Sequence, residues 1–308
     1  MRGCRGAAHS DEPAYLADDF LHDLFSGKRL VNTKLNIKRI IMCADDFGMN
    51  SAIDEGILHL ARLGRLSATS CLVQGPTFKT SAPALKLSGL QLGLHLNFTE
   101  AMDQAGLYYP VNKLIAETYL RRLDTARVRK QVTRQLDVFE SVLGQAPDYV
   151  DGHQHVHQFP QIREMLLLEL ARRYSSSLPA LRYTRARSAP GVSLGLPLKA
   201  LLIQLLGARR FAQLARNQGF SLNGRFLGVY DFQGGKLAYE SLLFLWLRSA
   251  LDGDLLMCHP ACQNEGSDSL GLQRLAEFEV LASDRTGLWF EQFGIRPGVF
   301  PKGGAPQR

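Results

Sequence analysis

Short apolar runs alternate along the chain with longer segments in which apolar residues recur every three or four positions. The short runs predict buried strands, whereas the longer periodicity is that of helices with one apolar face. Strands are expected over residues 37–43, 68–73, 92–96, 149–150, 181–184 and 255–258. Helices are expected over residues 53–63, 83–87, 127–143, 162–174, 198–217, 237–251 and 270–282, and a further short apolar run covers residues 288–290.

The order of these elements predicts an α/β fold. Strands and helices alternate, and the connections are too long for β-hairpins, so successive strands are expected to be parallel and joined by helical crossovers. A barrel and an open sheet both satisfy this pattern. We expect a single domain over residues 37–295, preceded by an N-terminal extension over residues 1–36 and followed by a C-terminal tail over residues 296–308.

The charge of the chain is basic without indicating a nucleic-acid partner. The 308 residues carry 36 Lys and Arg against 29 Asp and Glu, a formal charge of +7. The basic residues between Arg121 and Arg134 alternate with apolar residues and Asp124, as on a solvated helix face, so we predict no nucleic-acid binding.

The same composition bears on location and oligomeric state. No apolar stretch approaches the roughly 20 residues of a membrane span, and the first residues carry acids where a signal peptide needs an apolar run. We expect a cytoplasmic protein without a transmembrane segment, and a homodimer is left open. The five cysteines include no CxxC pair, so neither a disulfide framework nor a thiolate zinc site around Cys258 and Cys262 is expected.

Histidines gather where the predicted strands end. Of eight histidines, five lie at or just after such ends: His95, His153, His155, His157 and His259. A single histidine in a strand is more often a buried core residue. In parallel α/β folds, however, side chains beyond the carboxyl ends of several strands converge, and the shared position of these five predicts a site there.

Two adjacent acids, Asp45 and Asp46, end the first predicted strand. At the end of a buried strand they would repel each other unless a cation or a proton relieved them. Alternatively, one of them caps the helix that begins near Ile53 and the other faces solvent. In an extended backbone the two side chains point to opposite sides, so we expect them to have different roles.

The segment over residues 151–157 carries the strongest signal. Asp151, His153, His155 and His157 alternate with other residues, and an extended backbone would place all four on one face. Imidazoles gathered in this way would repel one another when protonated, whereas a metal ion binds them in their neutral form. This pattern predicts a metal site in which some members bind the ion and others orient the ligands.

Together these residues would provide one divalent cation with carboxylate and imidazole ligands, and leave one acid and one histidine unused. That combination suits metal-assisted hydrolysis, in which the cation polarises a carbonyl group, the acid takes a proton from water and the histidine protonates the leaving group. No GxSxG turn, GxGxxG strand-to-helix motif or P-loop is present, so acyl-enzyme, dinucleotide and nucleotide chemistry have no supporting motif.

The motifs at residues 44–48, 93–97, 151–157 with Pro160, and 259–260 with 274–277 resemble, in their order and spacing, those of the YdjC-like carbohydrate deacetylase family. This family includes chitooligosaccharide deacetylases. The resemblance implies a distorted TIM-like (β/α) barrel that removes an acetyl group from an N-acetylated sugar or oligosaccharide by amide hydrolysis.

The resemblance also implies roles for individual residues. One divalent cation, Mg2+ before Zn2+, Mn2+ or Co2+, would be held by Asp46, His95 and His153. Asp45 would be the general base and His259 the general acid. The residues expected to orient these groups or to meet the substrate are Asp151, His155, His157 and Arg182.

Several interpretations stay open at this point. A metal-dependent phosphoesterase uses the same ligand types, often with two metals, and a catalytically silent carbohydrate-binding protein would keep the site without turnover. Arg182 and Arg185 would bind sugar hydroxyls or an anionic group, or be ordinary surface arginines. Residues 230–232 would supply an aromatic platform for a sugar ring, and residues 188–228 part of the substrate wall.

Overall fold

The computed structural model describes residues 36–185, 204–266 and 268–302. The chain divides at Asn36, and the fold described below is that of the second unit, which begins at Ile37. The expected helix over residues 198–217 therefore lies partly outside the described residues.

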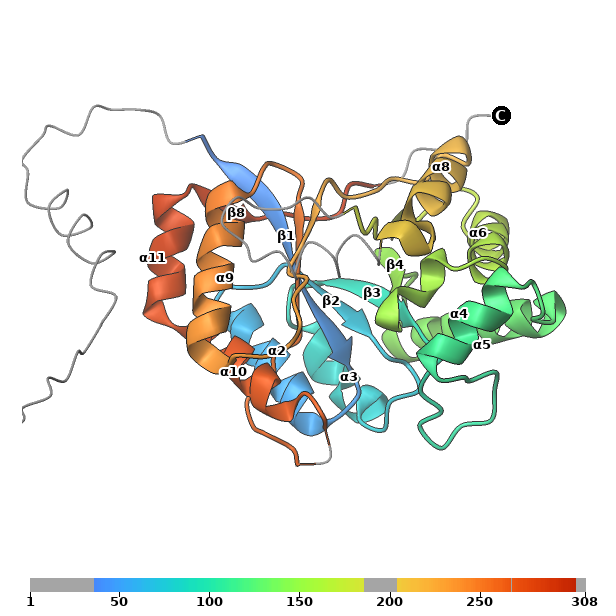
Figure 1. The fold of residues 1–308 in the computed structure, drawn as a ribbon, viewed down its shortest axis with the longest axis horizontal. Helices are drawn as coiled ribbons and strands as arrows, with labels where there is room; N and C mark the ends of the chain where they lie inside the picture. The colour runs from blue at the N-terminus through green and yellow to red at the C-terminus, as the bar shows by residue number, and fades with distance from the viewer. Residues whose placement is uncertain (1–35, 186–203, 267, 303–308) are drawn as a thin grey trace, which may run out of the picture. The chain divides into compact units, whose positions relative to one another are not determined.

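In the described part of the chain, one sheet of eight parallel strands forms the centre of the second unit (Figure 1). The strands are β1 Lys38–Phe47, β2 Ala68–Cys71, β3 Gln91–Leu96, β4 Tyr149–Gly152, β5 Ala180–Leu181, β6 Phe226–Leu227, β7 Leu255–Cys258 and β8 Ile295–Pro297. Their order is β5-β4-β3-β2-β1-β7-β6, and β8 pairs with the start of β1.

The two ends of this strand order approach each other. The N–H of Leu181, in β5, donates to the carbonyl of Ser221 at 2.9 Å, and Leu181 forms a parallel bridge with Leu222. The N–H of Phe226, in β6, donates to the carbonyl of Arg185 at 2.9 Å. The sheet thus curls into a half-barrel, in agreement with the α/β class and the distorted TIM-like barrel expected from the sequence.

Helices cover the outside of the curled sheet (Figure 1). They are α2 Ser51–Arg62, α3 Phe78–Lys86, α4 Val111–Tyr119, α5 Thr125–Leu143, α6 Ile162–Arg173, α8 Arg209–Asn217, α9 Gly235–Ser249, α10 Gly271–Ala282 and α11 Asp284–Gln292, with the 3-10 turn η1 His153–Gln158 and the π-helical turn η2 Gln204–Ala208. In Figure 1, α9, α10 and α11 lie on the side of α2, whereas α4, α5, α6 and α8 lie on the opposite side.

Helix α5 shows how the sequence sets these elements. Its apolar residues at helical spacing, among them Val128, Val132 and Leu136, are fully buried. The carboxylate of Asp124 accepts hydrogen bonds from the N–H groups of the first turn, and the helix ends where Gly144 follows. The helix expected over residues 127–143 is confirmed.

Other expectations needed revision. The helix expected up to residue 217 is interrupted, because Gly207, inside the turn Gln204–Ala208, has a φ of 113°, and α8 begins only at Arg209. The short helix expected over residues 83–87 begins earlier, at Phe78. Helix α4 and strands β6 and β8 were not expected, because two- and three-residue strands and a nine-residue helix carry little periodicity.

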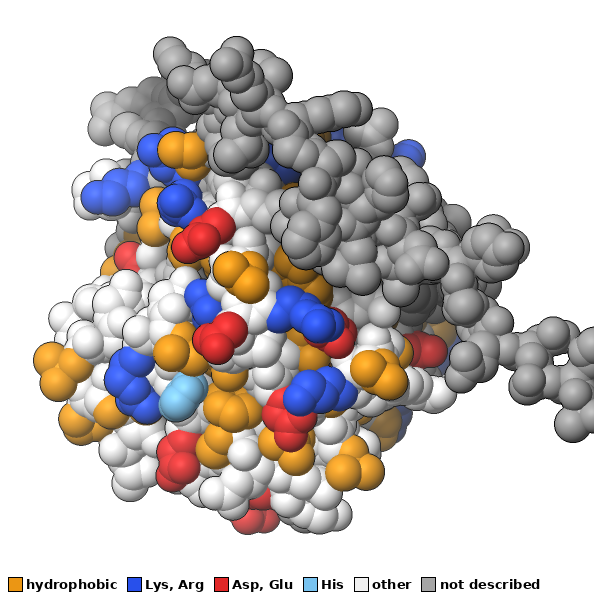
Figure 2. Space-filling model, turned by 90° about the vertical axis from the view of Figure 1, so that its left-hand side faces the viewer, with side chains coloured by type: hydrophobic (Ala, Val, Ile, Leu, Met, Phe, Trp, Pro, Cys, Tyr) orange, Lys and Arg blue, Asp and Glu red, His pale blue; other side chains and the backbone are white. Residues whose placement is uncertain are grey.

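Two features of the described residues bear on the expectations of no membrane span and no nucleic-acid partner. No described helix is both long enough and apolar enough to span a bilayer. Figure 2 shows one face of the molecule, on which acidic and basic side chains are interspersed with apolar ones, so neither charge sign dominates that face.

The packing around Gly93 in β3 leaves no room for a side chain, and a substitution at this position tests this. A Cβ atom at this position would lie 2.3 Å from the ring of Tyr149 in β4. We expect Gly93→Ala to lower the free energy of unfolding by about 1–3 kcal/mol, as overpacking does. Urea denaturation measures this difference, with Gly266→Ala as control because nothing lies within 4 Å of its added Cβ. Equal unfolding midpoints would contradict the packing argument.

Candidate active site

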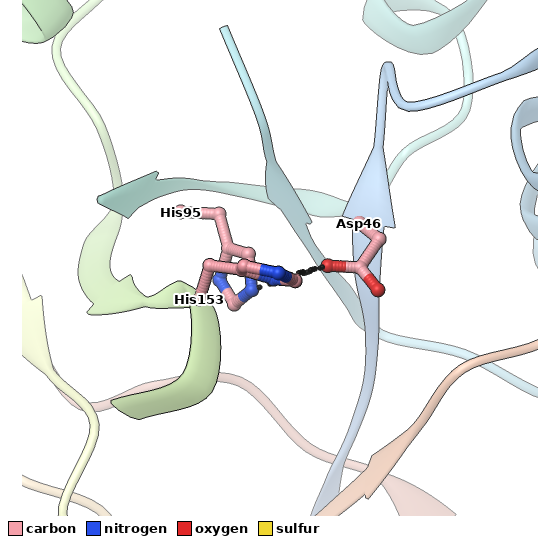
Figure 3. Close-up of side chains that lie close together, drawn as sticks. All are labelled: Asp46, His95 and His153. Carbon is pink, nitrogen blue, oxygen red and sulfur yellow. Dashed lines mark hydrogen bonds and ion pairs between the residues drawn. The ribbon is translucent and has the colours of Figure 1, made fainter. Parts of the chain in front are cut away.

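Asp46, His95 and His153 converge although they are far apart in sequence. Asp46 lies at the end of β1, His95 near the end of β3 and His153 directly after β4, and in Figure 3 their side chains point toward one another. Asp46 Oδ1 is 3.0 Å from His153 Nδ1 and 3.4 Å from His95 Nε2. One ligand atom from each residue lies within 4.8 Å of the others, which fits a single cation bound by one carboxylate and two imidazoles.

The two acids of β1 face the same cavity, contrary to the expectation that they point to opposite sides. Asp46 has a φ of 72°, and the pairing of β1 with β2 shifts between Ala44 and Phe47. This irregular backbone breaks the alternation of a regular strand. The capping alternative is also wrong, because Asn50 caps α2 by accepting from the N–H of Ile53 at 2.9 Å.

The expectation that residues 151–157 are extended was wrong as well. Strand β4 ends at Gly152, and the chain then turns through η1 with φ of 52° at Gln154 and 60° at His155. The side chains of this segment consequently diverge. His155 lines the cavity, whereas His157 is fully buried and donates from Nε2 to the carbonyl of Arg182 at 3.1 Å.

Asp151 links His95 to the buried interior. In the register of β3 and β4 the two residues are direct partners, and His95 Nδ1 lies 2.6 Å from Asp151 Oδ1. A carboxylate at this nitrogen leaves Nε2, on the side of Asp46, free to face a cation. The other oxygen of Asp151 lies 2.6 Å from Arg182 Nη2 and accepts from the hydroxyl of Ser70 at 2.6 Å.

Arg182 is fully buried, which contradicts the interpretation of this residue as a surface arginine. Its Nη1 and Nη2 donate to the two carboxylate oxygens of Asp45 at 2.6 and 2.5 Å, and Nη2 also contacts Cys43 Sγ at 3.0 Å. Cys43, Asp45 and Asp151 form a second cluster of ligand-type atoms. The guanidinium group of Arg182 is the cation of that cluster.

These contacts determine the charge of the site. Burial acts to raise the pKa of Asp45, but the guanidinium group of Arg182 together with the imidazoles of His95 and His259 holds the pKa well below its usual range. Burial acts to lower the pKa of His95, but the carboxylates of Asp151 and Asp45 raise it to about 10. The carboxylates around the cavity therefore favour a positive charge inside it.

Arg274 on α10 belongs to the motif over residues 274–277, and its contact with Asp46 is visible only in the structure. Its Nη2 donates to Asp46 Oδ2 at 2.7 Å, on the carboxylate oxygen that does not face the histidines. Glu277, three residues later, is also buried. The sequence signal for such roles is that Arg274 and Glu277 are spaced to lie on one face of a helix. The sequence does not indicate which residues they would contact.

His259 follows β7 and lies opposite Asp45. Its Nε2 is 3.9 Å from Asp45 Oδ2, and its ring makes an edge contact with Phe232 at a centroid distance of 5.0 Å. Burial lowers the pKa of His259 to about 4, so the imidazole is neutral at neutral pH.

These groups share one cavity of about 430 Å³. Its polar members are the two acids of β1 and the imidazoles of His95, His153, His155 and His259, with Gln154 beside them. The remaining wall is apolar and comes from several elements: Val111, Ile115, Phe159, Leu206, Val229, Tyr230, Phe232, Met257 and Leu270. Arg182, Asp151 and His157 do not line the cavity and lie behind it.

Comparisons with known proteins agree with this architecture. The model of the family described as YdjC-like protein matches residues 39–292. A carbohydrate deacetylase of Mus musculus is 28% identical over 297 residues, which covers 84% of this chain and 92% of that protein. A chitooligosaccharide deacetylase of Salmonella heidelberg is 27% identical over 276 residues, covering 85% and 97% of the two chains.

A solved structure shows the same fold. It is that of a protein of Enterococcus faecalis described as a cellobiose-phosphate cleavage protein, with 22% identity, a TM-score of 0.62 and coverage of 85% of this chain and 97% of that one. The chain belongs to the YdjC-like family, as its motifs predicted.

The buried arginine gives a test of the site's electrostatics. Arg182→Met leaves Asp45 and Asp151 buried without this counter-charge, so we expect the free energy of unfolding at pH 7 to fall by about 3–5 kcal/mol. In the wild type the lowered pKa of Asp45 contributes stability above its unfolded pKa, which is lost on acidification. In the variant burial is opposed only by the imidazoles of His95 and His259, so the pKa of Asp45 rises and its protonation on acidification relieves the defect.

The difference between wild type and Arg182→Met should therefore narrow as the pH falls below the ordinary carboxylate range. Denaturant unfolding at several pH values measures it. Arg172→Met is the matched control, because Arg172 is exposed and its partner Glu169 keeps an ion pair with Arg129, so the loss of Arg172 should change stability little. A difference that widened on acidification would contradict the assignment of Arg182 as the counter-charge.

Proposed function

We propose that this protein is a metal-dependent hydrolase that removes the acetyl group from an N-acetylated sugar or oligosaccharide. The convergence of Asp46, His95 and His153 in one cavity, beside Asp45 and His259, carries this proposal. Membership of a family in which relatives are named carbohydrate and chitooligosaccharide deacetylases supports the substrate class.

Asp46, His95 and His153 would hold one divalent cation, with Mg2+ the first candidate. When bound, such a cation polarises the carbonyl group of an amide and lowers the pKa of a water molecule. Asp151 fixes the ring of His95 through Nδ1, and Arg274 fixes Asp46 through Oδ2, so the residues around the ligands keep their donor atoms directed at one point.

Asp45 is the proposed proton acceptor. Because Arg182 keeps its carboxylate ionised and in place, Asp45 is available to take a proton from water, although the same contact weakens it as a base. His259 is neutral at rest, so it must first gain a proton before giving one to the leaving nitrogen. Its Nε2 lies 3.9 Å from Asp45 Oδ2, too far for a direct hydrogen bond, so a proton taken at Asp45 would reach His259, and then the leaving group, through one bridging water.

The cavity wall supports an uncharged substrate that is partly apolar. Phe232 and Tyr230 present rings to the cavity, as expected of a platform for a sugar ring, and no described Lys or Arg lines it. His155 lines the cavity and would contact the substrate. Arg182 and His157 do not line it: Arg182 binds Asp45, and His157 bonds the backbone carbonyl of Arg182.

The second cluster of acids argues against the phosphoesterase alternative. A two-metal site would need ligands for a second cation, but the cluster of Cys43, Asp45 and Asp151 already pairs with Arg182. A silent binding protein would not require Asp45 and His259 beside the ligands.

The proposal predicts acetate release from N-acetylated mono- or oligosaccharides that depends on an added divalent cation. We expect Asp46→Ala and His153→Ala to lower kcat/KM by about 1000-fold or more, because each removes a ligand of the cation. A coupled acetate assay over several metals measures this. His59→Ala, on α2 and outside the cavity, is the control. Elemental analysis should give one cation per chain, and two would favour the phosphoesterase.

Asp151 is expected to act through His95. Asp151→Asn keeps an acceptor for His95 Nδ1 but loses the charge that favours the imidazole as a ligand. We predict a cation affinity lower by about 10- to 100-fold, measured by isothermal titration calorimetry. Asp148→Asn, on the exposed side three residues earlier, should leave the affinity unchanged. An unaltered affinity in Asp151→Asn would remove this residue from the site.

A further inference from the structure

Glu277 on α10 is a fully buried carboxylate that the proposed mechanism does not use. Its Oε1 accepts a hydrogen bond from the hydroxyl of Tyr230 at 2.5 Å, and its Oε2 accepts one from the backbone N–H of His259 at 2.6 Å. Tyr230 follows β6 and His259 follows β7. One carboxylate therefore connects two separate segments of the cavity wall.

The two bonds satisfy a group that is costly to bury. A carboxylate taken out of water destabilises the fold unless hydrogen bonds or an opposite charge compensate it. Burial raises the pKa of Glu277 to about 7 even with these two donors and with Arg274 nearby. An apolar residue would avoid this cost, so the carboxylate needs a reason beyond packing.

Glu277 reaches the ring of His259 by a second route. The ring of Tyr230 packs against that of Phe232 at a centroid distance of 4.7 Å, and Phe232 contacts the ring of His259 at 5.0 Å. The backbone of His259 is thus held directly by Glu277, and its imidazole contacts Phe232, which packs against the Tyr230 ring that Glu277 anchors. Both routes fix the direction in which His259 Nε2 faces Asp45.

We infer that Glu277 is a positioning residue. Its side chain is long enough to bond both Tyr230 and the backbone of His259, and this length, rather than its charge, sets the position of His259. The inference rests on the proposed function, in which His259 transfers a proton. A proton donor displaced by about 1 Å loses up to roughly 100-fold in rate, so the bonds of Glu277 would act on kcat.

Two conservative variants separate the effect of side-chain length from the effect of charge. Glu277→Asp keeps the charge but is one methylene shorter, so it cannot contact both Tyr230 and His259. Glu277→Gln keeps the reach, because its amide oxygen can accept from the N–H of His259 and its amide nitrogen can donate to the hydroxyl of Tyr230.

We expect the Asp variant to lose about 10- to 100-fold in kcat, whereas the Gln variant stays within about threefold of the wild type. Cation affinity should change little in both, because Glu277 makes no hydrogen bond or ion pair with Asp46, His95 or His153 among the described contacts. KM is expected to rise in the Asp variant alone, because that variant releases Tyr230, which lines the proposed sugar platform. Kinetics are measured well below the melting temperature of each variant. Glu279→Asp and Glu279→Gln, on the exposed face of the same helix, are the matched controls.

A Gln variant more impaired than the Asp variant would show that charge is what matters and would overturn the inference. Wild-type kcat in the folded Asp variant, with only its melting temperature reduced, would reduce Glu277 to a structural role and would also overturn it. If the wild type releases no acetate from any substrate, the proposed function fails. Crystal structures of both variants then decide the positioning role, since His259 should move in the Asp variant alone.

Discussion

The buried pairing of Arg182 with Asp45 and Asp151 is the interaction on which the site depends. Two carboxylates and one guanidinium group are buried together, so removing any one of them leaves an uncompensated charge. Through Asp45 the pairing fixes the proposed proton acceptor, and through Asp151 it fixes the ring of His95. The strands β1, β4 and β5 are brought into register by the same sheet that buries this cluster, so fold and site cannot vary independently.

Around this cluster the ligand residues are held from both sides. His95 is oriented by Asp151 and Asp46 by Arg274, so two of the three proposed ligands have a fixed direction before a cation arrives. This preorganisation requires unusual backbone at Asp46, Gln154 and His155, all of which have positive φ. Strained residues of this kind persist only where the surroundings over-determine them, and here they lie beside the converging donor atoms.

Much of the fold could be predicted from the sequence because long periodic segments specify their own structure. The apolar face of α5 and the short apolar runs of β1, β3 and β7 are local signals, and parallel pairing follows from the length of the connections. Helix α4 and strands β6 and β8 could not be predicted, because their short sequences form these elements only through tertiary contacts.

The residue types at the strand ends were set by the sequence alone: two acids, five histidines and their order along the chain, together with the resemblance to the YdjC-like family. Their directions were decided only by the tertiary structure. An extended backbone would have separated Asp45 from Asp46 and aligned Asp151 with the three histidines after it, and both expectations were wrong. Side-chain direction depends on φ and ψ at single residues, and the partner of a buried charge depends on strands distant in sequence, so neither is encoded in a local pattern.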